Sequence, residues 1–206
     1  MFYNRQDAGE RLAKKLRKYK DNKRTILLAI PRGGVAVAKE VAKQLNLPLD
    51  LIIVRKLPMP DNPESGIGAI SEDGTLVWQP VKNFYPDYLV QKILEEQKKE
   101  IAKRIKILRK GKALLNLEDK IVILIDDGIA MGSTMEAAIK TVKNKGAKKV
   151  IVAVPVGGRE ILAKIKKLVD DLICLEIPQD FYAVAQVYKN WYDLSDEEVI
   201  KILREK

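Results

Sequence analysis

The fold of this chain is decided by residues 121–135, which read IVILIDDGIAMGSTM. The first five residues are apolar without alternation, a pattern that predicts a β-strand covered on both faces. After the strand the chain must turn sharply through glycine-rich sequence into a helix, and we expect Ser133 or Thr134 to cap that helix. The stretch therefore predicts a strand, a tight turn and a helix start in immediate succession.

The turn has the features of a site for a phosphorylated sugar. Its free backbone N–H groups, the dipole of the helix and the two hydroxyl groups can together hold a phosphate dianion. Asp126 and Asp127 stand before the turn and can accept hydrogen bonds from vicinal ribose hydroxyls. A plain glycine-rich turn beside a solvated pair of acids is the alternative interpretation. The expected phosphate-binding residues are Gly128, Ile129, Ala130, Met131, Gly132, Ser133 and Thr134.

Two better-known phosphate loops do not match this stretch. The pattern G-x-x-x-x-G-K-[ST] is missing, and so is the dinucleotide-binding pattern G-x-G-x-x-G. The stretch instead resembles the phosphoribosyl-pyrophosphate (PRPP) signature of type I phosphoribosyltransferases. The resemblance extends over most of residues 25–190. It indicates PRPP binding but does not identify the acceptor.

Length and composition agree with one domain over residues 1–206. The chain is 47% hydrophobic, which is enough to bury one α/β core. No apolar signal region or membrane-length apolar run is visible, so we expect a cytoplasmic protein without a membrane partner. The single cysteine, Cys174, lies in an apolar segment and is expected in the core. Because the chain contains no histidine, His-centred hydrolysis and zinc chemistry are excluded or nearly so.

The net charge of +10 is concentrated in two segments, Lys14 to Arg24 and Lys98 to Lys112. Both have apolar residues at three- and four-residue spacing, so we interpret their basic side chains as solvated faces of helices. A nucleic-acid surface is the alternative, but the second segment carries no aromatic residue that could stack on bases. Nucleic acid is therefore not an expected partner.

The rest of the chain alternates between predicted helices and strands. The expected helices cover residues 5–19, 35–45, 87–110 and 159–168, and the expected strands cover residues 25–30, 49–54, 149–154 and 172–177. Gly146 should end the helix of the quoted stretch, and the capping box Ser195-Asp-Glu-Glu198 should open a last short helix. Residues 57–74 are rich in proline and glycine and predict a long mobile loop, with a hairpin resuming at Thr75 to Trp78. Strands with helical crossovers imply an α/β fold, a Rossmann-like parallel sheet flanked by helices, whose ligands bind beyond the carboxyl ends of the strands.

The segment from Ile30 to Gly34, which reads IPRGG, follows the first strand directly and falls on that edge. Its two glycines let backbone amides approach an anion closely, and it resembles the pyrophosphate loop of the family. The resemblance assigns Arg32, Gly33 and Gly34 to PRPP binding. It also implies a non-proline cis peptide bond between Arg32 and Gly33. A plain turn ahead of a helix is the alternative.

Arg55 and Lys56 follow the second strand and precede the expected mobile loop. In the family a flexible loop at this place closes over PRPP, because water would capture the oxocarbenium-like transition state. The resemblance therefore implies that the two cations stabilise the departing pyrophosphate and form the catalytic set with Asp126 and Asp127. A solvated strand end is the alternative for the two cations.

Residues from about 176 to 195, with the N-terminal segment, resemble the small hood of purine-salvage members of the family. There Phe181 would stack on the acceptor base, with Tyr182 beside it, although core packing of Phe181 is nearly as well supported. Ala130 stands where 6-oxopurine enzymes have an acidic residue, and Tyr188 stands where they have an aspartate. Hypoxanthine and guanine are therefore disfavoured as acceptors.

The resemblance implies a reaction as well as a fold. A type I phosphoribosyltransferase would transfer the 5-phosphoribosyl group of PRPP to a nitrogen acceptor, here expected to be a nucleobase in nucleotide salvage, and release pyrophosphate. Mg²⁺ is the expected cofactor, held mainly by PRPP and not by a cage of protein ligands. A homo-oligomer, expected to be a dimer, is also implied. The alternative is a non-catalytic PRPP-sensing regulatory protein of the same fold.

Overall fold

The computed structural model describes residues 1–63 and 65–205, so Glu64 and Lys206 lie outside the described residues. Its helices are α1 (Arg5–Lys15), α2 (Gly33–Leu45), α3 (Asp87–Leu108), α4 (Ser133–Asn144), α5 (Arg159–Lys166) and α6 (Asp196–Arg204). Its strands are β1 (Thr25–Ala29), β2 (Leu49–Leu51), β3 (Val54–Pro58), β4 (Gly66–Ser71), β5 (Leu76–Trp78), β6 (Ile121–Ile125), β7 (Lys149–Val156) and β8 (Asp171–Glu176). Short 3-10 helices are η1 (Arg17–Tyr19), η2 (Pro80–Phe84) and η3 (Val184–Val187).

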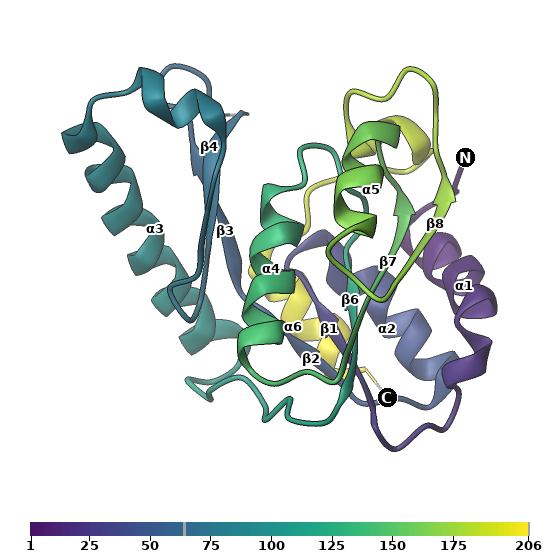
Figure 1. The fold of residues 1–206 in the computed structure, drawn as a ribbon. Coiled ribbons are helices and arrows are strands. Elements are labelled where there is room, and N and C mark those ends of the chain that lie inside the picture. Colours follow the sequence, from purple (N-terminus) through teal and green to yellow (C-terminus); the bar gives the residue numbers. More distant parts are fainter. Residues whose placement is uncertain (64, 206) are drawn as a thin grey trace.

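Five strands form a parallel sheet in the order β2-β1-β6-β7-β8, as Figure 1 shows. The strands β1 and β6 are neighbours, with Ala29 paired to Ile125 at their carboxyl ends. The chain leaves β1 toward one edge of the sheet and leaves β6 toward the other, so this pair is the topological switch point where ligands of such sheets bind. The expected parallel sheet with helical crossovers is confirmed.

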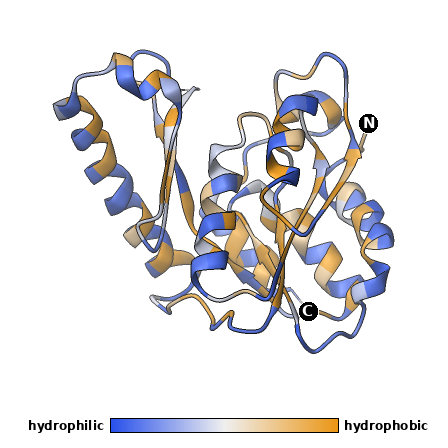
Figure 2. Cartoon of the chain, viewed as in Figure 1, coloured by the Kyte–Doolittle hydropathy of each residue, from blue (hydrophilic) through white to orange (hydrophobic). Residues whose placement is uncertain are grey.

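The parallel sheet separates two apolar layers. Ile123 and Ile125 of β6 pack into one cluster with side chains of α1, α2 and α6, whereas Val122 and Leu124 pack into the other with side chains of α4 and α5. Figure 2 shows apolar residues gathered along the strands and hydrophilic residues on the outer helix faces. The unbroken apolar run of β6 is explained by this coverage of both faces. No helix among the described residues combines the length and apolar character of a membrane span.

A second, smaller sheet departs from the sequence-based expectation. The strand expected over residues 49–54 divides: β2 ends at Leu51 in the parallel sheet, and β3 begins at Val54 in an antiparallel sheet with β4 and β5. The helix α3 packs against β3 and β4, and this unit stands to one side of the parallel sheet in Figure 1. The expectation of a long loop over residues 57–74 is wrong for much of that range, because the end of β3 and all of β4 lie within it.

Gly66 and Gly68, which suggested a loop in the sequence, lie in β4 and allow it to approach β3 and β5 closely. A Cβ atom on Gly68 would lie 2.2 Å from the carbonyl oxygen of Val77 in β5. A Cβ atom on Gly66 would lie 2.8 Å from Cγ of Lys56 in β3. Glycine inside a strand marks such close contacts, and the pattern of the sequence does not distinguish this use of glycine from a loop.

Two of three expected helix ends are confirmed. The hydroxyl of Ser195 accepts a hydrogen bond from the N–H of Glu198 at 3.1 Å, and the carboxylate of Glu198 accepts one from the N–H of Ser195 at 2.8 Å. Gly146 follows α4 with a φ of +78°. The expected side-chain cap of α4 is wrong, because Gly132 with a φ of +83° occupies the cap position and makes no side-chain cap.

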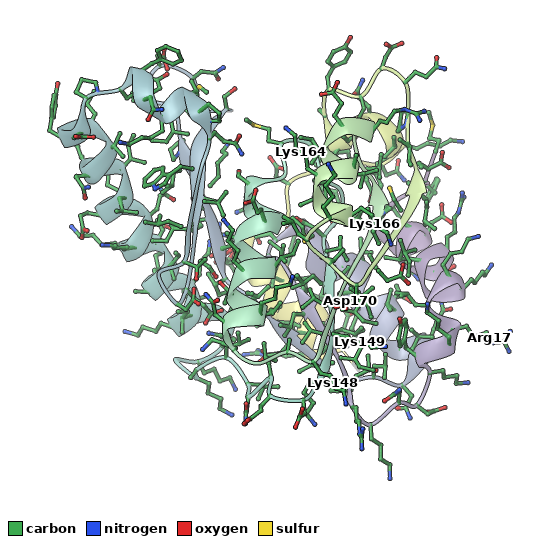
Figure 3. All side chains as sticks on the ribbon, in the orientation of Figure 1. Arg17, Lys148, Lys149, Lys164, Lys166 and Asp170 are labelled. Carbon is green, nitrogen blue, oxygen red and sulfur yellow. The ribbon has the colours of Figure 1, made fainter. Side chains whose placement is uncertain are left out.

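In the two basic segments, residues 14–24 and 98–112, the basic side chains are exposed with two exceptions. Those of residues 14–24 are exposed, as expected, and Figure 3 shows further lysines, among them Lys148 and Lys164, along α5 and the amino end of β7. In and after α3, however, Arg104 is half-buried and Arg109 is buried. The expectation of a solvated face is wrong for these two arginines. The helix α3 packs against β3 and β4, and Arg109, just after it, donates to the carbonyl oxygen of Leu51 and pairs with Glu72.

Cys174 lies half-buried in β8, and its thiol donates a hydrogen bond to the carbonyl oxygen of Glu176 at 3.2 Å. Burial raises the pKa of the thiol to about 11. A thiol that keeps its proton at neutral pH is a weak nucleophile, which agrees with a packing role.

Candidate functional site

Two loops meet at the carboxyl ends of β1 and β6. A Cβ atom on Gly33 would lie 1.8 Å from Oδ2 of Asp127, and one on Gly34 would lie 2.7 Å from the carbonyl oxygen of Ile125. A side chain at either position would overlap the segment that follows β6. The two glycines therefore let the 30–34 loop pack directly against the acidic pair, as their positions after neighbouring strands predict.

The 30–34 loop contains a non-proline cis peptide bond, between Pro31 and Arg32. The expected position between Arg32 and Gly33 is wrong by one bond. Gly33 already begins α2, and Arg32 is its N-cap with φ −98° and ψ −45°. The bond between these two residues is part of the first helical turn, which requires trans geometry.

The turn after β6 lines a cavity of about 230 Å³. Residues 128–135 form most of its wall, and Lys56, Asp126 and Val184 complete it. Within the described part of the chain the N–H groups of residues 133–135 make no hydrogen bond, so the start of α4 is open to an anion. The geometry fits the phosphate-binding turn of residues 128–134 that the sequence predicts, which we call the phosphate cradle.

Asp126 lies partly buried at the edge of this cavity. Its Oδ1 accepts a hydrogen bond from the backbone N–H of Asp127 at 2.8 Å. Burial and the neighbouring carboxylate raise the pKa of Asp126 well above its ordinary value. A carboxyl group that holds its proton can donate a hydrogen bond to a sugar hydroxyl as well as accept one.

Asp127 is held by a residue that the sequence analysis missed. Nε of Arg5 donates to Oδ2 of Asp127 at 2.8 Å, and the two side chains are only 7% and 13% exposed. Arg5 also donates to the carbonyl oxygen of Tyr192 at 2.8 Å and lies 4.0 Å from the centre of the Trp191 ring. Asp127 is therefore engaged by its neighbours, whereas Asp126 faces the cavity.

One signal in the sequence could have identified Arg5. It shares the buried face of α1 with Ala8 and Leu12, at the spacing of an apolar stripe. A charged side chain on an apolar stripe becomes buried when the helix packs, and burial is costly unless the charge is paired. The identity of that partner, 122 residues away, has no local signature.

The N-terminal segment and the 176–195 segment join above the acidic pair. The N–H of Phe2 donates to the carbonyl oxygen of Val187 at 2.7 Å. The hydroxyl of Tyr188 donates to the backbone carbonyl oxygen of Asp127 at 2.8 Å. The rings of Phe2 and Tyr188 lie 5.5 Å apart. Tyr188, noted in the sequence only as a departure from the family pattern, thus ties the two segments to the turn after β6.

The two cations after the second expected strand point in opposite directions, since successive side chains of a strand alternate. Lys56 lines the 230 Å³ cavity with Asp126. Arg55 turns to the other side, where its Nε donates to Oε1 of the buried Gln97 of α3 at 3.0 Å. The structure therefore brings Lys56 to the cavity at the turn after β6 and places Arg55 against α3.

The two aromatic residues of the expected acceptor site differ in position. Phe181 is half-buried and lines a cavity of about 380 Å³, which it shares with Ala130 of the cradle and with Arg159. Tyr182 is 81% exposed and lies outside this lining. Phe181 also packs against the cluster of Phe2 and Tyr188, so the core interpretation and the cavity interpretation both apply to it.

Comparisons with known proteins agree with this geometry. The family model described as "Phosphoribosyl transferase domain" matches residues 3–190. The Mycobacterium tuberculosis protein named "Putative phosphoribosyl transferase MT0597" is 40% identical over 206 residues, which cover 98% of this chain and 46% of that protein. The chain thus spans less than half the length of that relative.

Two solved structures share the fold. The crystal structure of TT1426 from Thermus thermophilus has 37% sequence identity and a TM-score of 0.79, and the match covers 98% of this chain and 97% of that chain. The purine phosphoribosyltransferase from Pyrococcus horikoshii has 19% identity and a TM-score of 0.51, with 91% and 88% covered. The second likeness shows the fold alone.

Proposed function

This chain belongs to the phosphoribosyl transferase family, and from that premise we propose that it transfers the 5-phosphoribosyl group of PRPP to a nitrogen acceptor and releases pyrophosphate. One observation carries the proposal. An open helix start, a carboxyl group and the glycine loop after the neighbouring strand converge at the switch point of the sheet. PRPP presents a phosphate, a vicinal diol and a pyrophosphate, one group for each of these three features.

Each group of PRPP has a counterpart among these residues. The N–H groups and hydroxyls of residues 128–134 receive the 5-phosphate. Asp126 bonds to the ribose hydroxyls, and Asp127 supports it from the ion pair with Arg5. The amides of the 30–34 loop face the pyrophosphate. Positive charge that develops at ribose C1 as pyrophosphate leaves is stabilised by the negative charge on the pair Asp126-Asp127, and Lys56 balances charge on the phosphates.

Magnesium fits this donor set as a partner of the substrate. Among the described residues no group of three or more acidic, histidine or cysteine side chains could hold a metal ion. Mg²⁺ at such sites keeps several waters and binds substrate phosphates with one or two carboxylates, and Asp126 is the carboxyl group at the cavity. When bound, the ion would neutralise part of the charge on the leaving pyrophosphate.

The 380 Å³ cavity is the proposed acceptor site. It adjoins the phosphate cradle through Ala130 and carries the half-buried ring of Phe181, on which a planar base could stack. Ala130 offers no carboxyl group to accept a proton from a 6-oxopurine. The acceptors to test first are therefore adenine, uracil, xanthine, orotate and simple amines.

A non-catalytic PRPP sensor is the second candidate, because one observation favours it. The ion pair with Arg5 already occupies one oxygen of Asp127. A sensor would bind PRPP with the remaining contacts and would not release pyrophosphate.

A pyrophosphate-release assay over that panel of bases, with PRPP and Mg²⁺, separates the two functions. The proposed enzyme releases pyrophosphate with at least one acceptor, and Lys56→Ala lowers turnover more than PRPP affinity, since the lysine acts on charge that develops in the transition state. The exposed Lys92 of α3 supplies a control, because Lys92→Ala removes a cation from the helix that covers the same sheet and does not line the cavity. If the protein binds PRPP but releases no pyrophosphate with any acceptor, the result would contradict the enzyme and support the PRPP sensor.

A further inference from the structure

Lysines from three separate segments form a basic surface along α5 and the amino end of β7. Figure 3 shows Lys164 and Lys166 of α5 above Lys149 and Lys148, which lie where β7 begins. A further lysine, in η1, belongs to the same surface. We call this surface the basic strip, and its members, all exposed, are Lys18, Lys148, Lys149, Lys164, Lys166 and Lys167.

Polar contacts join the three segments of the basic strip. Asp171 of β8 accepts from Nζ of Lys18 at 3.1 Å and from Nζ of Lys166 at 3.4 Å, so it links η1 to the end of α5. The neighbouring Asp170 accepts from the N–H of Val150 at 2.8 Å, which ties the same place to the start of β7. The strip is therefore one continuous surface, although its segments lie far apart in the sequence.

Most of the positive charge of the basic strip is uncompensated. Its two acids are engaged, because Asp171 pairs with two lysines and Asp170 accepts from a backbone N–H. A small cavity beside the strip adds two acids but three cations, namely Glu118, Asp119, Arg24, Lys120 and Lys148. Within the part of the chain that the structure describes, four lysines of the strip make no ion pair: Lys148, Lys149, Lys164 and Lys167. Such a concentration of one sign of charge attracts a polyanion.

The chemistry of the basic strip favours a phosphate backbone over other anionic partners. Among the described residues, none of the exposed large apolar side chains belongs to the strip. A protein interface has an apolar core, and a helix on a membrane surface inserts aromatic or leucine side chains. The half-buried ring of Tyr19 packs against the core, whereas single-stranded nucleic acid is held on exposed aromatic rings. A duplex presents its phosphates outside and keeps its bases stacked, so it requires none of these features.

We propose that the basic strip binds double-stranded nucleic acid through its phosphates, without reading its sequence. This function is separate from the proposed transfer reaction, because no lysine of the strip lines the cavities assigned to PRPP and to the acceptor. The sequence-based expectation against nucleic acid considered long basic segments and stacking aromatics. The fold instead assembles the strip from short segments, and a duplex needs no stacking. Each neutralised phosphate releases counterions, so the affinity should fall steeply with salt.

The test compares two variants with the same change in net charge. The strip variant combines Lys148→Gln, Lys149→Gln, Lys164→Gln and Lys167→Gln. The control variant combines Lys92→Gln, Lys99→Gln, Lys103→Gln and Lys106→Gln, all at exposed positions of α3. Fluorescence anisotropy measures the affinity for DNA and RNA duplexes of about 20 base pairs, from about 50 to about 200 mM KCl. The strip variant should bind more than about tenfold weaker at about 100 mM salt, with a salt slope smaller by about 3 to 4, and the control should stay within about threefold of the unsubstituted protein.

Three results would overturn the proposal. The first is no duplex binding at the lowest salt concentration, and the second is equal weakening in both variants, which would assign the affinity to net charge alone. The third is tighter binding to the single strand, or to vesicles of phosphatidylcholine and phosphatidylserine, than to the duplex. Exposed lysines contribute little to stability, so both variants should keep the melting temperature of the unsubstituted protein. Strip-dependent duplex binding by a protein that does not bind PRPP would support the strip and contradict the proposed function.

Discussion

Arg5 and Asp127 form an ion pair that the rest of the molecule holds in place. Arg5 is fixed by the carbonyl oxygen of Tyr192 and by the ring of Trp191, and it donates to Oδ2 of Asp127. Asp127 is therefore both a proposed ribose ligand and the attachment point of the C-terminal segment. Changes at this carboxylate should affect stability as well as binding.

The first prediction concerns Asp127→Asn. The amide keeps the shape of the side chain but leaves Arg5 buried without its counter-ion, so the free energy of unfolding should fall by about 2 to 4 kcal/mol. Urea unfolding at pH 7 measures this change. The exposed Asp193 lies in the same segment, and Asp193→Asn should cost less than about 0.5 kcal/mol. Equal stability of the two variants would contradict a structural role of the ion pair.

A second prediction concerns the pH dependence that Asp126 imposes. Its pKa in the folded protein is raised above 3.8, so the folded state binds this proton more tightly than the unfolded state. The contribution of this group to stability is present below pH 3.8 and is lost as the pH rises through the folded-state pKa. The amide of Asp126→Asn cannot ionise, so the variant does not lose this stability as the pH rises. Its free energy of unfolding should therefore increase relative to that of the unsubstituted protein above about pH 4.

Urea unfolding from about pH 4 to about pH 8 checks this second prediction. The difference in free energy of unfolding between Asp126→Asn and the unsubstituted protein should grow with pH and then level off. A difference that does not vary with pH, or that shrinks, would show that Asp126 is ionised in the folded protein with an ordinary pKa.

The acidic pair, the glycines of the 30–34 loop and the phosphate turn could be predicted from the sequence because each is part of a short motif beside a strand. Arg5 could be suspected from its place on the apolar stripe of α1, but its partner Asp127, 122 residues away, could not be predicted. Where only tertiary packing brings two side chains together, the identity of the partner has no local signature.

At the scale of secondary-structure elements, the second sheet depends on contacts that glycine makes possible. The central parallel strands β1, β6 and β7 were predictable because each contains an unbroken apolar run. β3 and β4 were not, because prolines and glycines lie at their ends and within them. In β4 the glycines permit pairing with β5, and all six residues of the strand are buried. Tertiary packing, and not local propensity, makes this segment a strand.

The third prediction tests that interpretation with Gly68→Ala. The added Cβ atom would lie 2.2 Å from the carbonyl oxygen of Val77, so β4 and β5 must separate. The melting temperature should fall by several degrees, corresponding to about 1 to 3 kcal/mol. At Gly158 the nearest atom to an added Cβ is 3.5 Å away and φ is −69°, so Gly158→Ala is the matched control and should be tolerated. Tolerance of both substitutions would contradict the close approach of β4 to β5.

At the scale of the whole molecule, three parts of the chain surround one edge of the parallel sheet. The loops after β1 and β6 form that edge, the N-terminal and 176–195 segments meet above Asp127, and the second sheet supplies Lys56. In the proposed function, PRPP with Mg²⁺ engages the turn after β6, the carboxyl groups and the 30–34 loop at once. Its binding should therefore stabilise the folded state as a whole.

The direct measurement is the melting temperature and the calorimetric heat of the protein with PRPP and Mg²⁺, against equal concentrations of inorganic phosphate at the same ionic strength. A ligand at 100 times its Kd adds about 2.7 kcal/mol to the free energy of unfolding, which for a chain of this size raises the melting temperature by roughly 5 to 10 °C. We predict such a rise, with saturable heat, for PRPP and not for phosphate. An unchanged melting temperature and no heat at millimolar PRPP would contradict the assignment of this site to PRPP.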